Sequence, residues 1–269
     1  MNAFPGRNEE RISMAGSPVS VPPFMELKSG FFVRAGGVFQ LHPERDAGAV
    51  RAVVKCFLHG NGEDSGYFKE QIRFFSKHFR VIAVDTRGHG RSPRGNAPFT
   101  LTQFAEDLRC FMLEMGIKKA HILGFSDGAN IAMLFALKYP QMTDRLILNS
   151  GNIFPSGMKL SVRLPIEAGY ALNKALSKIS KRAKKQAELL GLMANEPHIR
   201  PKELSAIRSK ALVIAGNKDM IKGSHTRLIA SSLPNSQLAI IWGDHFTAAK
   251  KPKVFDRVVY RFLTEKERS

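Results

Sequence analysis

AHILGFSDGANIAMLFALKY, residues 120–139, runs from an apolar segment through a serine between two glycines into a helical pattern. We expect a buried strand at 120–124 and a helix from about Asp127 to Tyr139, which Pro140 stops. The junction, 124–128, matches G-x-S-x-G in the strand-to-helix context that this motif requires. A sharp turn there projects the hydroxyl of Ser126 clear of the sheet, so Ser126 is predicted to be a nucleophile. The alternative is that Ser126 merely caps the helix.

Short β-branched runs and helical patterns alternate on both sides of this stretch. The expected strands are 52–58, 81–85, 145–149, 211–215 and 237–241, and the expected helices are 65–79, 101–115, 224–233 and 252–263. Strands joined through helices favour a parallel sheet. The sequence therefore predicts an α/β fold with a mostly parallel central sheet flanked by helices.

Three regions differ in pattern. Residues 1–25 are expected to form a flexible amino-terminal arm, and 26–150 with 210–265 the α/β core. The segment 151–209 has helical periodicity and no convincing strand, and a structureless loop of that length is improbable, so we expect a short helical cap insertion. The amino-terminal edge of the sheet is the least defined, with short apolar pieces only at 31–33 and 38–41.

The composition limits the classes of protein to which this chain can belong. Hydrophobic residues make up 43% of the 269 residues, and no apolar run approaches the ~20 residues that span a bilayer. The first 25 residues lack the apolar stretch of a secretory signal, so we predict a soluble, cytoplasmic protein. Cys56 and Cys110 are too few for a disulfide framework or a cysteine metal site and are expected to be buried free thiols.

The formal net charge of +18 is the unusual bulk property. Between Leu172 and Lys185 no acid occurs among six cations, Lys174, Lys178, Lys181, Arg182, Lys184 and Lys185, which we expect to shape the approach to a site. No element that reads nucleic acid and no interleaved aromatics accompany them, so no nucleic-acid partner is predicted. An anion or nucleic-acid binder with steeply salt-dependent affinity stays as an alternative.

A serine nucleophile needs a histidine to take its proton and a carboxylate to orient that histidine. Asp219 follows the strand at 211–215 and His245 follows the strand at 237–241, so both belong to the sheet edge that carries Ser126. Their order along the chain, serine, acid, histidine, is one of the orders in which such a triad occurs. Asp219 is preferred as the acid, and the competing carboxyl groups belong to Asp85, Asp127 and Asp244.

The loop His59-Gly60-Asn61-Gly62 separates a predicted strand from a predicted helix. Its backbone N–H groups, that of Asn61 first, are expected to form an oxyanion hole with the N–H of Asp127. Phosphate binding is the alternative, but the loop lacks the ending of a P-loop and the spacing of a dinucleotide fingerprint.

Together these residues resemble the α/β-hydrolase superfamily, in particular its small esterase-like members with a short helical cap, over about residues 26–263. The segment 85–92, DTRGHGRS, is similar to a structural turn common in that family, so His89 is not expected to be catalytic. The resemblance implies hydrolysis through an acyl-enzyme on Ser126 without metal or organic cofactor. A serine at this position argues against haloalkane dehalogenase or epoxide hydrolase chemistry, in which an aspartate attacks.

The expected function is hydrolysis of a carboxylic ester of a small or medium substrate. Five apolar residues are candidates for its acyl pocket: Phe125, Phe154, Met158, Met193 and Phe246. The same triad also serves carbon–carbon, amide or thioester bonds. A small-molecule receptor that keeps the triad is an alternative of another class. The sequence leaves the oligomeric state open.

Overall fold

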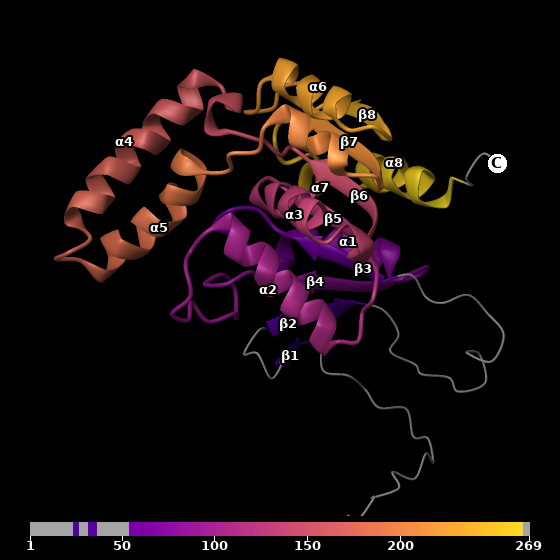
Figure 1. Ribbon diagram of the computed structural model, residues 1–269, viewed down its shortest axis with the longest axis horizontal. Helices are drawn as coiled ribbons and strands as arrows, with labels where there is room; N and C mark the ends of the chain where they lie inside the picture. The colour runs from indigo at the N-terminus through magenta and orange to yellow at the C-terminus, as the bar shows by residue number, and fades with distance from the viewer. Residues whose placement is uncertain (1–23, 27–31, 37–53, 266–269) are drawn as a thin grey trace, which may run out of the picture.

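An eight-stranded sheet forms the centre of the computed structural model, which describes residues 24–26, 32–36 and 54–265 (Figure 1). Its order is β1-β2-β4-β3-β5-β6-β7-β8. The strands are β1 (Phe24–Glu26), β2 (Phe32–Gly36), β3 (Val54–Leu58), β4 (Arg80–Val84), β5 (Ala120–Phe125), β6 (Thr143–Asn149), β7 (Lys210–Gly216) and β8 (Ser236–Ile241). β2 pairs antiparallel with both of its neighbours, and every pair from β4 to β8 is parallel. The mostly parallel sheet is therefore confirmed.

Helices cover both faces of the sheet because its strands are buried on both sides. In β5, Ile122 packs on the face covered by α2 (Leu101–Glu114), α3 (Asp127–Lys138) and α6 (Gly223–Ser232). The next residue, Leu123, packs on the opposite face, which is covered by α1 (Lys69–Phe75), α7 (Thr247–Lys250) and α8 (Pro252–Thr264). This alternation with a period of two divides the core into two layers of side chains.

Two expectations differ from the structure, and a third lies partly outside the described residues. The helix expected at 65–79 is a 3₁₀ turn, η1 (Ser65–Phe68), followed by the shorter α1, and the Asp64 side chain caps η1 by accepting from the N–H of Gly66. The prediction that both cysteines are buried is wrong for Cys110, which is exposed on the side of α2 away from the core. At the amino-terminal edge, β2 ends at Gly36, and the apolar piece expected at 38–41 lies outside the described residues.

The segment 151–209, which connects the neighbouring strands β6 and β7, contains a pair of helices, α4 (Leu160–Leu176) and α5 (Lys181–Asn195), between the short turns η3 (Pro155–Gly157) and η4 (Pro201–Ala206). Another short turn, η2 (Pro140–Met142), precedes β6. The two helices pack on each other and project to the left of the sheet in Figure 1. α5 buries Ala183, Ala187 and Leu192, whereas no residue of α4 is buried. Of the amino-terminal arm expected at 1–25, only Phe24 and Met25 are described.

Candidate active site

The turn at Ser126 is held by contacts between backbones. Ser126 has φ 52° and ψ −119°, a positive φ that a non-glycine residue rarely adopts. A Cβ at Gly124 would lie 2.1 Å from the carbonyl oxygen of Gly128, and one at Gly128 would lie 2.0 Å from that of Leu58. Both glycines of the motif are therefore required by space. Ser126 occupies the N-cap position of α3, but its hydroxyl makes no capping hydrogen bond, so the capping alternative fails.

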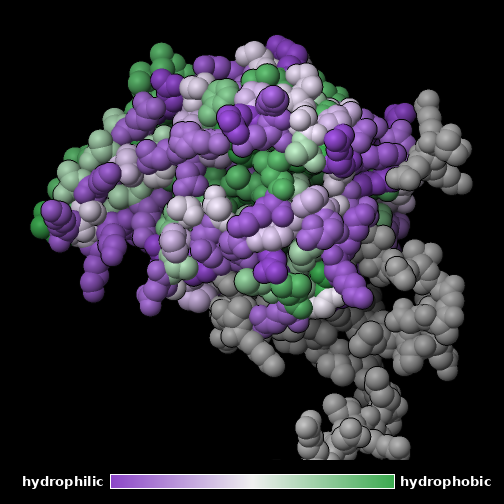
Figure 2. All heavy atoms as spheres, viewed as in Figure 1, coloured by the Kyte–Doolittle hydropathy of each residue, from purple (hydrophilic) through white to green (hydrophobic). Residues whose placement is uncertain are grey.

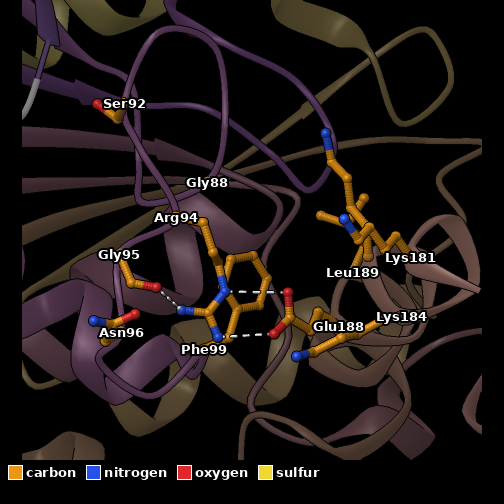
Figure 3. Close-up of a pocket in the computed structure, with 11 residues that line it drawn as sticks. Gly88, Ser92, Arg94, Gly95, Asn96, Phe99, Lys181, Lys184, Glu188 and Leu189 are labelled. Atoms are coloured by element: carbon orange, nitrogen blue, oxygen red, sulfur yellow. Dashed lines mark hydrogen bonds and ion pairs between the residues drawn. The ribbon is translucent and has the colours of Figure 1, made fainter. Parts of the chain in front are cut away.

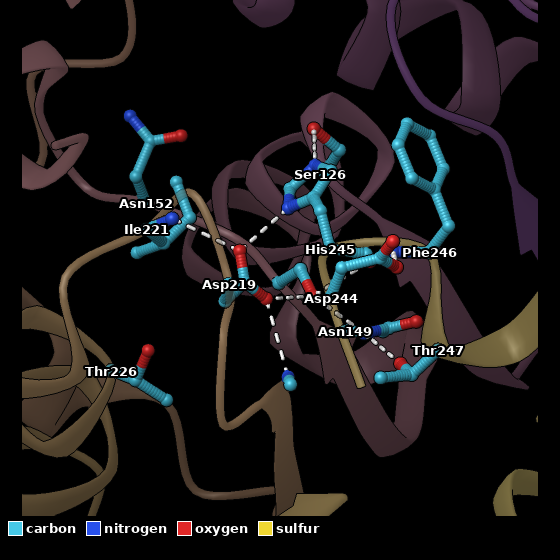
Figure 4. Close-up of polar contacts among 12 residues, drawn as sticks. Ser126, Asn149, Asn152, Asp219, Ile221, Thr226, Asp244, His245, Phe246 and Thr247 are labelled. Atoms are coloured by element: carbon cyan, nitrogen blue, oxygen red, sulfur yellow. Dashed lines mark hydrogen bonds and ion pairs between the residues drawn. The ribbon is translucent and has the colours of Figure 1, made fainter. Parts of the chain in front are cut away.

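The hydroxyl of Ser126 lies instead at one end of a chain of hydrogen bonds (Figure 4). Its Oγ is 3.1 Å from Nε2 of His245, and Nδ1 of His245 is 2.7 Å from Oδ1 of Asp219. A carboxylate only accepts, so Nδ1 carries the proton and Nε2 is left to accept from Ser126. The structure thus brings together the three residues that the sequence predicts as a triad.

Asp219 is 3% exposed and is surrounded by donors. Besides its contact with His245, it accepts from the N–H of Ile221 at 2.9 Å (Figure 4). It also accepts from the Ser150 hydroxyl at 2.7 Å. Burial alone would raise the pKa of this carboxyl, but the hydrogen bond and charge of His245, followed by these two donors, hold it below its ordinary value. Asp219 is therefore a carboxylate at neutral pH, as the orientation of His245 requires.

The competing carboxyl groups have other partners. Asp85 accepts from the backbone N–H groups of Ser65 at 2.7 Å and Arg91 at 3.0 Å, so it fastens the turn after β4. Asp244 accepts from the N–H of Phe246 and the amine of Lys250. Neither carboxyl takes the place of Asp219 beside Nδ1 of His245.

Asn61 and Asp127, the two residues expected to form the oxyanion hole, are in contact through their side chains. The side-chain amide of Asn61 donates to Oδ2 of Asp127 at 2.8 Å and to the carbonyl of Leu189 in α5 at 2.9 Å. Burial raises the pKa of Asp127 above its ordinary value, although the hydrogen bond from Asn61 partly opposes this shift. The N–H groups of the first turn of a helix have no carbonyl partner within that helix, and Asp127 opens α3. A bond between the side chains of Asn61 and Asp127 thus links the loop after β3 to the start of α3, next to Ser126.

Sequence reasoning missed the residue that fixes this loop, His59. Its Nε2 accepts from the N–H of Thr86 at 3.0 Å, so its Nδ1 carries the proton and donates to the carbonyl of Gly60 at 2.7 Å. Burial first, and then the charge of His89, lower the pKa of His59 to about 4. His59 is therefore neutral and joins the loop after β3 to the end of β4.

Glu63 is a second charged group that the sequence did not single out. Its Oε2 accepts from the N–H of Gly60 at 3.2 Å. Burial raises the pKa of Glu63 to about 7, against the lowering effects of the Gly60 bond and of the charge of His245. A carboxyl group that titrates near neutral pH thus lies within electrostatic reach of His245.

The five apolar candidates for an acyl pocket occupy different surroundings. Phe125 is buried and stacks on Tyr67, with ring centroids 4.3 Å apart. Phe246, in contrast, is 39% exposed next to His245. Met158 is buried, and Phe154 and Met193 are half-buried. Their role at a pocket stays a prediction.

A cavity of about 550 Å³ lies between the turn after β4 and the helix α5 (Figure 3). Arg94 and Glu188 form an ion pair across it at 2.8 Å, and three lysines of α5 contribute to its wall, Lys181, Lys184 and Lys185. None of the triad residues lines this cavity. It adjoins the loop after β3 at Leu189, which belongs to the cavity wall and whose carbonyl accepts from the side chain of Asn61.

Comparison with known proteins identifies a family that matches this chain and several related proteins. The family model described as the alpha/beta hydrolase fold matches residues 56–191. The "Putative carbamate hydrolase RutD" of Caulobacter sp. (strain K31) is 27% identical over 243 residues, which are 76% of this chain and 88% of that protein. Epoxide hydrolase 3 of Mus musculus is 31% identical over 135 residues, but these are 49% of this chain and 34% of that protein.

Two solved structures have the same fold. The enol-lactonase from Burkholderia xenovorans LB400 has a TM-score of 0.71 at 22% identity and covers 90% of this chain and 100% of its own. The carboxylesterase CesB from Bacillus subtilis has a TM-score of 0.67 at 19% identity and covers 87% of each chain. At such identities the likeness concerns the fold alone.

Proposed function

Because this chain is a hydrolase of the α/β-hydrolase fold family, we propose that it cleaves carboxylic esters of small or medium substrates through an acyl-enzyme on Ser126. The observation that carries the proposal is the chain of hydrogen bonds from Ser126 through His245 to Asp219, at 3.1 and 2.7 Å. This arrangement activates a serine hydroxyl that is otherwise a poor nucleophile at neutral pH.

In the first half of the proposed reaction, Oγ of Ser126 attacks the ester carbonyl carbon while Nε2 of His245 takes the hydroxyl proton. Asp219 stays ionised and stabilises the imidazolium. When the tetrahedral intermediate collapses, the bond to the alkoxy oxygen breaks, and the alcohol leaves with the proton from His245. In the second half, His245 takes a proton from water, the resulting hydroxide equivalent attacks the acyl-enzyme, and Ser126 regains its proton as the carboxylic acid departs.

The negative oxygen of both tetrahedral intermediates is proposed to accept from the backbone N–H groups of Asn61 and Asp127. Two features support this assignment. The N–H of Asp127 belongs to the positive end of α3, and the bond from the Asn61 side-chain amide to the Asp127 carboxyl group joins the loop after β3 to that end. Donors that are held in place before the reaction need no reorganisation when the charge develops.

The names of relatives agree with an acyl carbonyl as the reacting group. A carbamate, an enol-lactone and a carboxylic ester, the groups in three of those names, each carry a carbonyl bonded to an oxygen or nitrogen leaving group. The serine at position 126 distinguishes this chain from hydrolases in which an aspartate attacks. Amide, thioester and carbon–carbon bonds remain within the reach of the same triad.

We further propose that residues 151–209 act as a cap that borders the substrate path. Two contacts support this role: Asn61 donates to the Leu189 carbonyl of α5, and Arg94 pairs with Glu188 of α5. Both tie the α4–α5 pair to loops that follow strands of the sheet edge carrying Ser126. The cavity between α5 and the turn after β4 then offers a route toward the oxyanion loop (Figure 3).

Hydrolysis of p-nitrophenyl esters of graded acyl length tests the proposal, with Ser126→Ala and with Ser205→Ala as the matched control. Ser205 is exposed, and its hydroxyl donates only to the carbonyl of Lys202. We expect Ser126→Ala to lower kcat by about 10⁴-fold or more and to abolish labelling by a fluorophosphonate, while Ser205→Ala behaves as wild type.

Wild-type protein that neither turns over these esters nor takes the label would contradict the proposal. The receptor alternative would then gain weight, because a binding protein keeps its affinity for a ligand after Ser126→Ala. Turnover that survives Ser126→Ala would place the nucleophile elsewhere in the chain.

A further inference from the structure

The outward face of the cap helix α4 is unusually apolar for a surface exposed to water. Five of the exposed large hydrophobic side chains in the described part of the chain belong to α4 or to the turn directly after it: Leu160 at 54% exposed, Leu164 at 51%, Leu172 at 61%, Leu176 at 40% and Ile179 at 84%. Single exposed leucines are ordinary on a protein surface, but a contiguous group of them marks an interaction site.

The spacing of these residues places them on one face. The four leucines follow one another at intervals of four, eight and four residues, which places them within about half of the circumference of the helix, and Ile179 lies in the turn just beyond it. Several exposed positions between them are also apolar, with alanine at 168, 171 and 175 and proline at 165, whereas Lys174 and Lys178 are the exposed cations of this stretch. The stripe therefore runs along the whole helix.

The opposite side of α4 is already occupied by α5. A Cβ at Gly169 would lie 3.2 Å from Leu190, and one at Gly191 would lie 3.2 Å from Tyr170, so the two helices approach closely at these glycines. The pair thus uses its inner faces against each other. Within the described residues, no side chain of α4 is buried, so its apolar stripe faces outward.

Positive charge surrounds the end of this stripe. The segment from Leu172 to Lys185 carries six cations and no acid: Lys174, Lys178, Lys181, Arg182, Lys184 and Lys185. The nearest acids on the two helices are engaged, Glu167 with Arg163 at 3.1 Å and Glu188 with Arg94 at 2.8 Å. Figure 2 shows hydrophobic and hydrophilic atoms side by side along the margin of the molecule where α4 and α5 lie.

We propose that the outward face of α4, with the basic turn between α4 and α5, docks on a membrane surface that contains anionic lipid. An apolar stripe bordered by lysines matches the boundary between acyl chains and headgroups, where the stripe is buried and the amines reach lipid phosphates. The helix lies on the surface in this arrangement. No helix in the described ranges is long and apolar enough to cross a bilayer.

Charge and apolar surface together favour an anionic lipid surface over two other possible partners of this face, a second copy of the chain and a nucleic acid. A second copy of the chain carries the same net charge of +18, which opposes its approach to this basic surface. A nucleic acid would satisfy the lysines but would leave the leucine stripe exposed to water. An anionic lipid surface satisfies both features. The proposal does not depend on the esterase assignment, because binding is measured without turnover.

Sedimentation of the full chain with vesicles tests the proposal. The vesicles are phosphatidylcholine alone or phosphatidylcholine with phosphatidylglycerol, at physiological ionic strength. Wild type is compared with a charge variant, Lys174→Gln/Lys178→Gln/Lys181→Gln, and with an apolar variant, Leu172→Ser/Leu176→Ser/Ile179→Ser. The control is Lys253→Gln/Val254→Ser, which changes an exposed lysine and a half-exposed valine on α8. Circular dichroism checks that every variant is folded.

We expect wild type and control to bind the anionic vesicles and to bind phosphatidylcholine far more weakly. The charge variant should lose about fivefold in partition per lysine, on the order of a hundredfold in total. The apolar variant should lose about tenfold or more, since three side chains no longer enter the lipid. Elevated salt should weaken the binding of wild type more than that of the charge variant.

Three results would overturn the proposal. The first is a wild type that does not sediment with anionic vesicles. The second is loss of binding in the charge variant but not in the apolar variant, which indicates general attraction to polyanions. The third is a wild type that is dimeric in sedimentation velocity while the apolar variant is monomeric, because the stripe would then be covered by a second copy.

Discussion

Two regions of the molecule are held in place by different contacts. One is the edge of the sheet that carries Ser126, and the other is the α4–α5 pair beside it. Asp219 and His245 are 3% and 5% exposed, and their polar atoms have partners in one connected set of hydrogen bonds. α4, in contrast, has no buried residue and packs along one side only. The difference separates two tasks: positions at the sheet edge are determined by many neighbours at once, whereas the surface of α4 is free to suit a partner.

The largest effect is expected where the sheet edge holds the imidazole. Asp219→Asn should lower kcat by about 10⁴-fold, because an amide can donate to Nδ1 and so stabilise the tautomer that cannot accept from Ser126. Asp244→Asn is the matched control next to His245, and its kcat should stay within about threefold of wild type, since Asp244 bonds Phe246 and Lys250 instead. Ester hydrolysis measures both variants. Equal losses in the two would remove the distinction between these carboxyl groups.

The two regions should also differ in stability. Leu146 is 0% exposed in β6, so Leu146→Ala should lower the free energy of unfolding by about 2–5 kcal/mol. Leu172 is 61% exposed on α4, so Leu172→Ala should change it by less than about 0.5 kcal/mol. Denaturant titration followed by circular dichroism measures both. A large loss for Leu172→Ala would mean that the stripe of α4 packs on the protein itself in solution.

Acid should weaken the sheet-edge region through His59. Burial, and then the charge of His89, lower the pKa of His59 to about 4, whereas a histidine in an unfolded chain has its ordinary pKa of 6.5. The unfolded state therefore binds more protons between these values, and stability falls as pH drops below about 6.5. At pH 5 the loss from this residue is about 2 kcal/mol.

His59→Gln tests this origin of the acid sensitivity. It should be less stable than wild type at pH 7, because the loop contacts change, but its free energy of unfolding should fall less between pH 7 and pH 5. His225, whose pKa burial also lowers to about 4, contributes to the slope that remains. An unchanged slope in His59→Gln would assign the acid sensitivity to other groups.

The smallest effect is expected at a donor to the triad acid. Ser150→Ala removes the 2.7 Å bond to Asp219, which raises the pKa of that carboxyl and loosens its hold on His245. We expect kcat to fall about tenfold at neutral pH, because Asp219 is then held less firmly beside His245. Ser205→Ala serves as the control. A kcat equal to that of wild type would show that the other donors suffice to hold Asp219 in place.

The triad candidates were predictable because parallel strands end at a common edge. Ser126, Asp219 and His245 each follow such a strand, so their order and position in the sequence sufficed to group them. Ser150 could not be predicted from the sequence, because its role depends on the pairing of β6 with β7. That pairing brings its hydroxyl to Asp219, 69 positions away. The role of His59 could not be predicted either, because its ring bonds the carbonyl of Gly60 and the N–H of Thr86, which follows another strand.

The helices of 151–209 were predictable from their periodicity, but the orientation of α4 was not. Leucines spaced like those at 160, 164 and 172 usually indicate a face buried in a core. Close approach at Gly169 and Gly191 directs the other side of the helix toward α5 instead. Which face of an amphipathic helix is covered depends on the neighbouring element, and the pattern of a single segment does not contain that information.

The place of the α4–α5 pair in the chain has a consequence for how such proteins diversify. The pair connects β6 to β7, two adjacent strands in register from Arg145 with Lys210 to Asn149 with Ile214, and Ser150 donates its N–H to the carbonyl of Ile214. Entry and exit of the insertion are therefore anchored on neighbouring strands of the rigid sheet. Lineages can lengthen, shorten or exchange this module, and protein engineers can graft another, while the strands that carry serine, aspartate and histidine keep their registration.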